Sequence, residues 1–481
     1  MDTVRTRFAP SPTGYMHIGN LRTALYSYLY AKSKDGKFIL RIEDTDKQRY
    51  VEDAVDFIYK TLADAGISHD EGPDTGGEFA PYVQSQRKDI YLSQALDLAA
   101  KGGAYFCFCE KNGSDEDKED GHSGYNRKCR DIPYEEALRR AENGEEYVIR
   151  QKMPKEGKTS YFDAVYGEIE VENALLEDQV LIKRDKMPTY NFANVIDDHL
   201  MDITHIIRGA DFLSSTPKYE LLYASYGWQS PVYAHLPLIM GQNEDGSISK
   251  LSKRHGATSF EQLLELGYLS EAIVNYIALL GWSPKSNEEI FSLDELEQLF
   301  SLEGISKSSS VFDYKKLDWV NSEYLSGMDD AEFASKAADY LNLNENAYGG
   351  KWAFCASLLK SRISRFSEIP EKLEFLNSLP EYDTELFINK KNKTSLETSK
   401  SVISELISIF SGTDEWEIDV LNEKTNEYAQ QISQKIGYIM WPFRIAVSGL
   451  AVTPGGASEL AYILGKDETI KRLAAALEKL G

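Results

Sequence analysis

The sequence predicts an α/β protein that begins with a doubly wound, parallel-sheet (Rossmann-type) domain carrying an α+β insertion and ends in an all-helical C-terminal region. Three patterns predict this fold class. A strand at residues 4–9, a helix at 21–32 and a buried strand at 37–42 follow one another, with a breaker-rich loop after the first strand. An irregular, charged stretch interrupts this pattern between residues 100 and 190. Beyond Leu325 proline is sparse and helical periodicity dominates.

The chain has 481 residues, enough for three or four domains of the usual size of roughly 100 to 200 residues. We expect five segments along it. They are the first half of the nucleotide-binding domain at 1–100, the insertion at 101–190, the second half of the domain at 191–245, a connecting region with a basic loop at 246–325, and the helical region at 326–481.

Composition predicts a soluble, cytoplasmic protein with no membrane partner. Hydrophobic residues make up 42% of the chain, and no window approaches the roughly 18 apolar residues of a membrane span. The N-terminus lacks the pattern of a secretory signal. A net charge of −24 opposes a polyanionic partner at long range, although local basic clusters could still bind one. Lys360, Arg362 and Arg365 are one candidate cluster, but their loose spacing favours the simpler interpretation of solvated charges on a helix.

The loop after the first strand has the composition of a phosphate-binding loop. It runs from Pro10 to Asn20 and leads into the first helix, whose N-terminus attracts anions through its free N–H groups and its dipole. Gly19 lets the backbone approach a ligand closely, and His17 can donate to phosphate oxygens. The candidate ATP contacts in this loop are Pro10, Thr13, Gly14, His17, Gly19 and Asn20. A proline-rich loop that only caps a helix is the alternative.

A second basic motif, Lys250-Leu251-Ser252-Lys253-Arg254, follows a turn-rich stretch far downstream. Lys250 and Lys253 on a mobile loop could bring positive charge to a pyrophosphate in the transition state. By itself, this motif is better explained as a solvated basic loop.

Three of the four cysteines lie close together in the insertion, which is not a disulfide framework. Cys107, Cys109 and Cys129 offer three soft ligands for a tetrahedral zinc ion, and Asp131 or, as an alternative, Tyr125 could be the fourth. Reduced thiols without a metal are the competing interpretation.

Taken together, the two loops resemble the HIGH and KMSKS elements of class I aminoacyl-tRNA synthetases. Residues 7–14 resemble the glutamyl branch, because the glutaminyl branch tends towards Glu and Asn where this chain has Ser11 and Thr13. The first element ends in Asn20 rather than His, and the second in Arg254 rather than Ser. The resemblance continues at 41–46, 188–199, 204–209, 312–319 and, more loosely, 441–449.

The resemblance implies ATP-dependent ligation of L-glutamate to the 3′ end of tRNA(Glu) through a glutamyl-adenylate, by a monomeric enzyme that uses Mg²⁺ and requires tRNA for activation. It implies catalytic roles for His17, Lys250 and Lys253, a tRNA acceptor-stem-binding insertion pinned by structural zinc, and an anticodon-binding C-terminal region. The implied glutamate contacts are Arg7, Ala9, Ser11, Glu43, Tyr190, Asn194 and Arg208. Without the family resemblance, surface ion pairs of Arg41 with Glu43 and of Arg208 with Asp211 would be the preferred interpretation.

Phe212 departs from the Trp or His that often follows the acid in relatives, which leaves any contact from that position undetermined. Three other functions compete: a shorter paralogue that glutamylates a modified tRNA base, a catalytically silent tRNA-binding relative, and a nucleotidyltransferase with a related loop. The sequence leaves open whether tRNA(Gln) is also charged, and Arg365 is a loosely aligned candidate for reading the third anticodon base.

Overall fold

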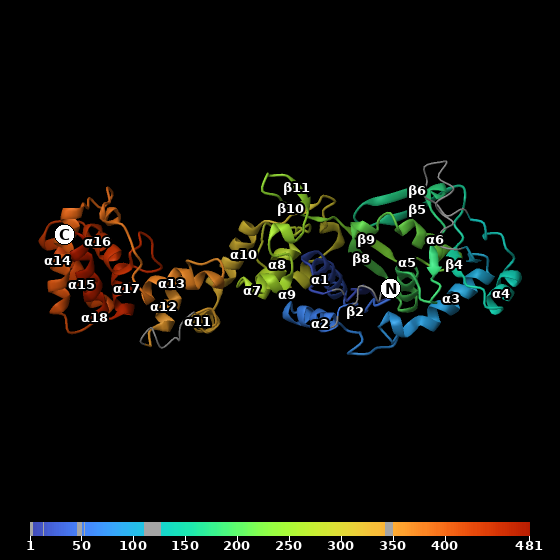
Figure 1. Ribbon diagram of the computed structural model, residues 1–481, viewed down its shortest axis with the longest axis horizontal. Coiled ribbons are helices and arrows are strands. Elements are labelled where there is room, and N and C mark those ends of the chain that lie inside the picture. Colours follow the sequence, from blue (N-terminus) through green and yellow to red (C-terminus); the bar gives the residue numbers. More distant parts are fainter. Residues whose placement is uncertain (1–2, 13, 46–50, 52, 110–126, 342–349) are drawn as a thin grey trace. The chain divides into compact units, whose positions relative to one another are not determined.

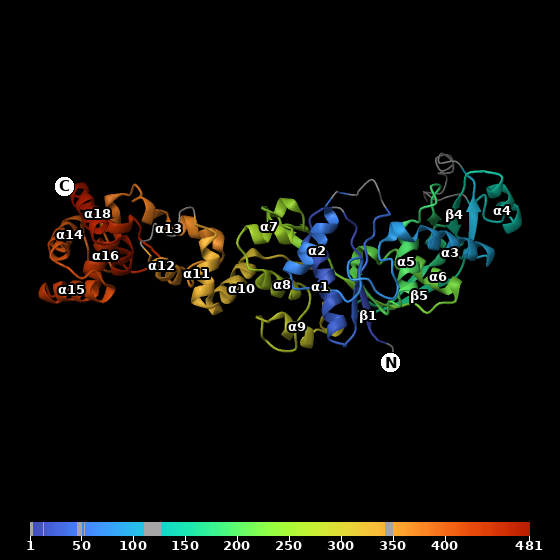
Figure 2. The same ribbon diagram turned by 90° about the horizontal axis from the view of Figure 1, so that it is seen from below.

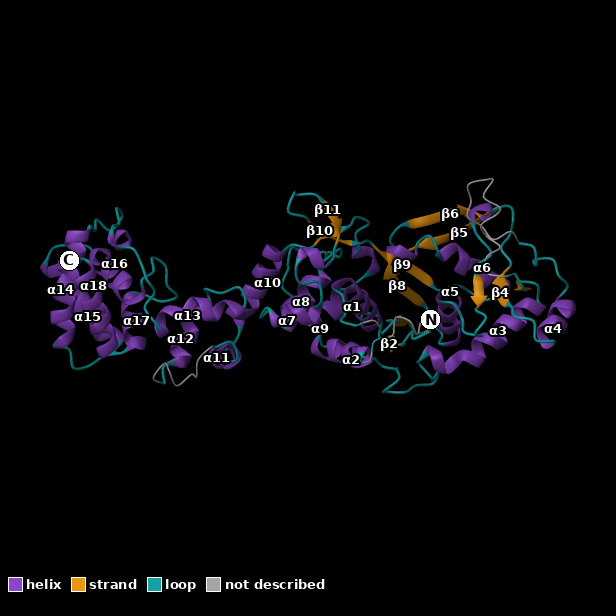
Figure 3. Ribbon diagram, in the orientation of Figure 1, coloured by secondary structure: helices purple, strands orange, loops and turns teal. Residues whose placement is uncertain are grey.

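The computed structural model describes residues 3–12, 14–45, 51, 53–109, 127–341 and 350–481. The chain forms two compact units, one of residues 1–264 and 270–317 and the other of 265–269 and 318–481. Figures 1 and 2 show the two units, and Figure 3 shows that the strands belong to the first. The finer five-segment division remains a prediction.

Parallel strands organise the nucleotide-binding half of the first unit, as predicted. Strand β1 (Arg5–Phe8) pairs with β2 (Lys37–Leu40), and helix α1 (Ile18–Lys32) connects them. Strand β8 (His205–Gly209) pairs in parallel with β9 (Val232–Leu236), with α6 (Thr216–Tyr226) between them in sequence. The Thr204 amide donates to the carbonyl of Arg5 at 3.0 Å, which joins β1 to the start of β8. Continuous apolar runs suit such strands because helices cover both faces.

The insertion is α+β, also as predicted. Helices α2 (Ala54–Asp64) and α3 (Lys88–Ala100) lead into an antiparallel sheet of β3 (Ala104–Cys107), β4 (Val148–Gln151) and β7 (Val180–Ile182), beside α4 (Tyr134–Glu142). Strands β5 (Lys158–Asp163) and β6 (Gly167–Glu172) form a hairpin, and Asp163 at its turn lies opposite Tyr233 of β9. The next helix is α5 (Tyr190–Leu200). The hairpin thereby extends the β8–β9 sheet.

The rest of the first unit carries the basic motif. Strand β10 (Ile239–Gln242) pairs with β11 (Ile248–Lys250) and β12 (Ser310–Val311). A 3₁₀ turn (Lys253–His255) and the helices α7 (Phe260–Glu265), α8 (Ser270–Ala278) and α9 (Leu293–Leu299) follow. Helix α10 (Tyr314–Gly327) begins in the first unit, which ends at Leu317, and the rest of it is counted in the second.

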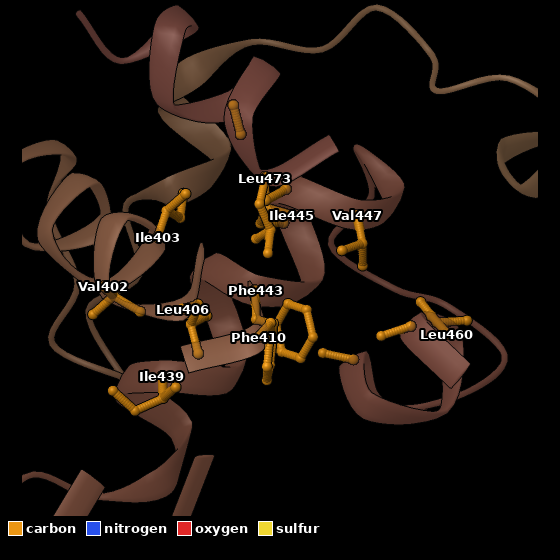
Figure 4. Close-up of a cluster of buried hydrophobic side chains, with 14 of the residues drawn as sticks. Val402, Ile403, Leu406, Phe410, Ile439, Phe443, Ile445, Val447, Leu460 and Leu473 are labelled. Atoms are coloured by element: carbon orange, nitrogen blue, oxygen red, sulfur yellow. The ribbon is translucent and has the colours of Figure 1, made fainter. Parts of the chain in front are cut away.

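Helices are the regular secondary structure of the second unit, and its described residues contain no strand apart from an isolated bridge of Asn389 with Thr394. Its helices are α11 (Asp330–Ala338), α12 (Trp352–Leu359), α13 (Ile369–Asn377), α14 (Leu396–Ser411), α15 (Ile418–Gln431), α16 (Ile436–Ser448), α17 (Ala457–Leu464) and α18 (Lys466–Lys479). Figure 4 shows its core, where Phe410 of α14 packs on Phe443 of α16 with ring centroids 5.1 Å apart. Both rings are fully buried, so the helical periodicity read from the sequence corresponds to a real apolar face. In the described part of the chain, no helix is long and apolar enough to cross a membrane.

Candidate active site

The two sequence motifs meet at one place in the first unit. The Ile18 amide, at the start of α1, donates to the carbonyl oxygen of Thr258 at 3.0 Å. His17 and Ser259 form an isolated antiparallel bridge. The segment that follows the basic motif is therefore paired through its backbone with the loop that opens α1.

His17 is the N-cap of α1 and is half-buried. Its Nδ1 accepts a hydrogen bond from the Gly19 amide at 3.1 Å, so the neutral ring carries its proton on Nε2. Burial lowers the pKa of His17, and the charge of Lys250 lowers it further. The imidazole is therefore neutral at pH 7, and its Nε2–H is a hydrogen-bond donor suited to a phosphate oxygen.

The remaining residues of the predicted ATP loop lie around the same helix start. Pro10 is buried, Gly14 and Gly19 are half-buried, and Asn20 is exposed. Gly14 has φ +115°, a conformation that favours glycine. Thr13 lies outside the described residues.

The basic motif is held by a residue that the sequence analysis missed. The His255 ring contacts Oδ1 of Asn243 at 3.0 Å and accepts from the Ser252 amide at 3.0 Å. A Cβ at Gly241 would lie 2.6 Å from this ring, so only glycine leaves room for it. Lys253 is exposed, and Lys250, 63% exposed, lies 3.2 Å from both carboxylate oxygens of Asp211. The fixed base of the loop therefore carries two lysines that reach solvent.

Beside this junction lies a buried cluster of charges. Arg7 of β1 donates to Asp198 of α5 at 3.0 Å, and Arg41 donates to Asp198 at 2.8 Å and to Glu43 at 3.0 Å. The Asp198 carboxylate keeps the pKa of Arg7 raised against burial. All four side chains are buried, so Arg41 and Glu43 do form an ion pair, but the alternative interpretation of a surface ion pair does not hold.

Glu43 has the features of a ligand-binding carboxylate. Its Oε1 accepts from Arg41 and from Gln84, whereas its buried Oε2 has no hydrogen-bond partner. Burial raises its pKa to about 7, although Arg41 and Arg7 oppose the shift. A buried acceptor without a partner is costly, so a bound donor such as an ammonium group would stabilise it.

Arg208 of β8 is a third buried arginine of this region, after Arg7 and Arg41. Its Nε donates to Nε2 of His235 at 3.1 Å, and its Nη2 donates to Thr216 at 2.8 Å. Asp211 pairs with Lys250 instead, so the alternative interpretation of a surface pair of Arg208 with Asp211 does not hold either. The guanidinium lies 5.0 Å from the Phe212 ring centroid, and Phe212 packs on Tyr190 at 5.4 Å.

The other predicted glutamate contacts lie nearby in the fold. Tyr190 and Asn194 are one turn apart on α5, and burial raises the pKa of Tyr190. Asn194 is buried, and its Nδ2 has no hydrogen-bond partner. Ala9, directly after β1, is half-buried, and Ser11 is exposed. The charges of Glu43, Arg208 and Arg7 act on Tyr190, so Tyr190 lies beside the charged cluster, with Asn194 one turn further along α5. Ala9 and Ser11 lie on the loop between β1 and α1.

Comparison with known proteins agrees with this arrangement. The family model described as tRNA synthetases class I (E and Q), catalytic domain, matches residues 3–319, and an anticodon binding domain model matches 324–477. The chain belongs to this class I synthetase family. It is 49% identical to the glutamate–tRNA ligase of Clostridium kluyveri over 100% of the chain and 99% of the relative, and 50% identical to that of Clostridium novyi over 99% and 98%.

A solved structure matches over the full length as well. The crystal structure of a glutamate tRNA ligase from Elizabethkingia meningosepticum in complex with its amino acid has a TM-score of 0.88 at 34% identity, with 100% of both chains covered. The match of the anticodon-binding model removes the shorter paralogue and the nucleotidyltransferase as alternatives for this synthetase.

The insertion of this synthetase holds the predicted cysteine cluster. The sulfur atoms of Cys107, Cys109 and Cys129 all lie within 4.8 Å of one another. Asp131 does not join them, because its side chain is 81% exposed and lies 3.6 Å from Lys152. Tyr125 lies outside the described residues. Three converging thiols fit a soft metal ion such as zinc, and the fourth ligand remains open.

The helical unit of the synthetase contains a cavity of about 800 Å³. Arg362 and Lys372 line it together with Glu371 and Pro454. Arg444 lies near Arg362. Burial lowers the pKa of Arg444, and the charge of Arg362 lowers it further. The buried Nε of Arg444 has no hydrogen-bond partner.

The three predicted basic residues of this unit do not form one patch. Lys360 pairs with Asp330, and Arg365 donates to Tyr268 at 3.0 Å. The three predicted basic residues therefore have separate environments, and Arg362 is the one at the cavity.

Proposed function

We propose that this synthetase uses ATP to join L-glutamate to the 3′-terminal adenosine of tRNA(Glu), releasing AMP and pyrophosphate. The pairing of the loop before α1 with the segment after the basic motif, beside the buried pocket of Arg7, Glu43 and Arg208, carries this proposal. One site can thus hold a triphosphate next to a small molecule that bears a carboxylate and an ammonium group.

The pocket matches the charges of glutamate. The Arg208 guanidinium would bind the side-chain carboxylate, with Arg7 as the second cation, since guanidinium groups bind carboxylates with directional hydrogen bonds. Glu43 would accept from the substrate ammonium through Oε2. Tyr190 and Asn194 on α5, with Ala9 and Ser11 after β1, would complete the contacts.

The reaction consists of two transfers. An oxygen of the glutamate α-carboxylate attacks the α-phosphorus of ATP, and the bond to the pyrophosphate leaving group breaks. A ribose hydroxyl of the tRNA end then attacks the acyl carbon, its proton is lost, and AMP leaves. Neither step needs an enzyme nucleophile, so positioning and charge stabilisation supply the rate enhancement.

Each motif residue then has a defined task. Nε2–H of His17 donates to a phosphate oxygen, and Pro10, Thr13, Gly14, Gly19 and Asn20 shape the loop around the nucleotide. Lys250 and Lys253 approach the departing pyrophosphate. When bound with ATP, Mg²⁺ would neutralise further phosphate charge.

Two further sites would serve the tRNA. The cluster of Cys107, Cys109 and Cys129 would hold a structural zinc ion that fixes the acceptor-stem insertion. Arg362 and Arg444 beside the C-terminal cavity would contact the anticodon, since an arginine whose Nε has no partner favours a nucleotide or phosphate acceptor.

An ATP–pyrophosphate exchange assay with and without tRNA(Glu), each with L-glutamate or L-glutamine, tests the proposal. We expect exchange with glutamate that depends on tRNA. Exchange with glutamine alone would contradict the amino-acid assignment, and no exchange under any condition would support a silent tRNA-binding relative. Charging of tRNA(Gln) in parallel decides whether the enzyme accepts both tRNAs.

A further inference from the structure

Arg208 is held in an unusual electrostatic environment for a buried arginine. Arg7 and Arg41 both pair with Asp198, but the structure shows no carboxylate partner for Arg208 among the described residues. Its guanidinium is 4% exposed and lies against the rings of Phe212, Tyr219 and Tyr233 at 5.0, 4.8 and 5.7 Å. The positive charge is thus buried without a compensating anion, which favours an anionic ligand.

The side chain that Arg208 contacts, where a buried arginine would usually have a carboxylate, is a histidine. Nε of Arg208 donates to Nε2 of His235, which must therefore carry a lone pair and no proton. Nδ1 of His235 lies 2.6 Å from Oδ2 of Asp163, so the ring proton is on Nδ1 and is donated to that carboxylate. His235 and Asp163 are both fully buried.

Asp163 is itself fixed by the backbone of the β5–β6 turn. Its Oδ1 accepts from the amides of Val165 at 2.9 Å and Tyr166 at 2.8 Å, and its Oδ2 accepts from the His235 amide at 3.1 Å. The carboxylate therefore cannot rotate without losing these bonds. Burial lowers the pKa of His235, which agrees with a neutral ring.

We propose that Asp163 and His235 are positioning residues that fix the tautomer facing Arg208 and so orient its uncompensated guanidinium for the substrate side-chain carboxylate. This inference rests on the proposed function. A carboxylate directly on Arg208 would neutralise the charge that glutamate needs, whereas a neutral imidazole orients the group and leaves its charge available. The pair thereby favours glutamate over the uncharged glutamine.

The kinetic test uses the full-length chain and tRNA-dependent charging. His235→Leu removes the acceptor, and we expect the KM for glutamate to rise about 10-fold to 100-fold, the range of a lost hydrogen bond to a charged group, while the KM for ATP stays within about twofold. His235→Gln places an amide oxygen near the position of Nε2 and should recover most of the loss. His205→Gln, on the same strand as Arg208, is the matched control and should leave the KM for glutamate unchanged.

Equal increases in the glutamate KM for the Leu and Gln variants, or no increase in either, would overturn the inference. Failure of the wild-type chain to charge tRNA with glutamate would instead contradict the proposed function itself.

Histidine ¹⁵N spectra test the tautomer independently of activity. The chain has seven histidines, and the signal lost in His235→Gln identifies His235. We expect a neutral ring at pH 7 with a protonated Nδ1 and an unprotonated Nε2. An imidazolium, or a proton on Nε2, would overturn the inference whatever the charging activity of the variants.

Discussion

The backbone amide of Ile18 donates to the carbonyl oxygen of Thr258 at 3.0 Å. This bond joins the first turn of α1, which follows the nucleotide loop, to the segment that follows the Lys250 to Arg254 motif. Residues far apart in sequence thus lie side by side, and the predictions for His17 and Lys253 depend on that junction.

His17 has two separable roles, as cap of α1 and as phosphate donor. His17→Ala should lower the kcat of activation about 100-fold to 1,000-fold, as expected for removal of a transition-state donor. It should also cost about 1 kcal/mol of stability through the lost cap. His17→Asn should restore the stability, because Asn is a good cap, and leave activation impaired. Pyrophosphate exchange and thermal unfolding measure the two effects, and full recovery of both by Asn would contradict the phosphate role.

Lys253 is exposed, so its removal should affect chemistry and not folding. Lys253→Gln should lower kcat for pyrophosphate exchange about 100-fold with an unchanged Tm. Lys60→Gln is the control, since Lys60 is an exposed lysine of α2 paired with Asp64. Equal activity of the two variants would contradict the role of the basic motif.

We expect glutamate binding to depend on pH because of Glu43. Its pKa in the folded protein is raised to about 7, so protonation below that pH removes the negative charge that faces the substrate ammonium. The KM for glutamate should therefore rise as the pH falls from 8 to 6. Below the pKa of Glu43, the rise should approach about tenfold for each pH unit. In Glu43→Gln the KM should be high and nearly independent of pH. A wild-type KM that stays flat across this range would contradict the ammonium contact.

The cysteine cluster predicts about one bound zinc ion per chain, measurable by elemental analysis. Cys109→Ser should lose most of it, because one of the three converging thiols is removed. Cys355→Ser is the control, since Cys355 is a buried cysteine of α12 in the other unit. Undiminished zinc in Cys109→Ser would contradict the site.

Removal of the Arg362 side chain should weaken tRNA binding specifically. Arg362→Ala should raise the KM for tRNA about tenfold, the loss expected for one nucleotide contact, without changing the KM for glutamate. Lys424→Gln, an exposed change on α15 of the same unit, should leave both values unchanged. A matching loss in both variants would indicate a general charge effect instead of a contact at the cavity.

The sequence predicted the fold class correctly because the fold class depends on local patterns. The run Phe38 to Ile42 is buried as its apolar pattern indicates, and helix α1 includes the predicted 21–32. Asp198 was missed, although it lies one helical turn beyond Asn194 on the same face of α5, and this spacing could have indicated it.

Other members of the site had no local signal. Asp163 and His235 come together only because β5 and β9 pair, and His255 only because Gly241 leaves space for its ring. The alternative of two surface ion pairs does not hold because it rested on nearness in sequence. In the fold, Arg41 is buried and pairs with both Glu43 and Asp198, and Arg208 is buried against a neutral histidine.

Hydrogen exchange with a non-hydrolysable glutamyl-adenylate analogue tests the central claim most directly. The account predicts slower exchange on binding both in the loop and first turn at residues 14–22 and in the basic segment at 250–260, together with the β8 strand that carries Arg208. Protection of one of the two motif segments without the other would contradict a single active centre.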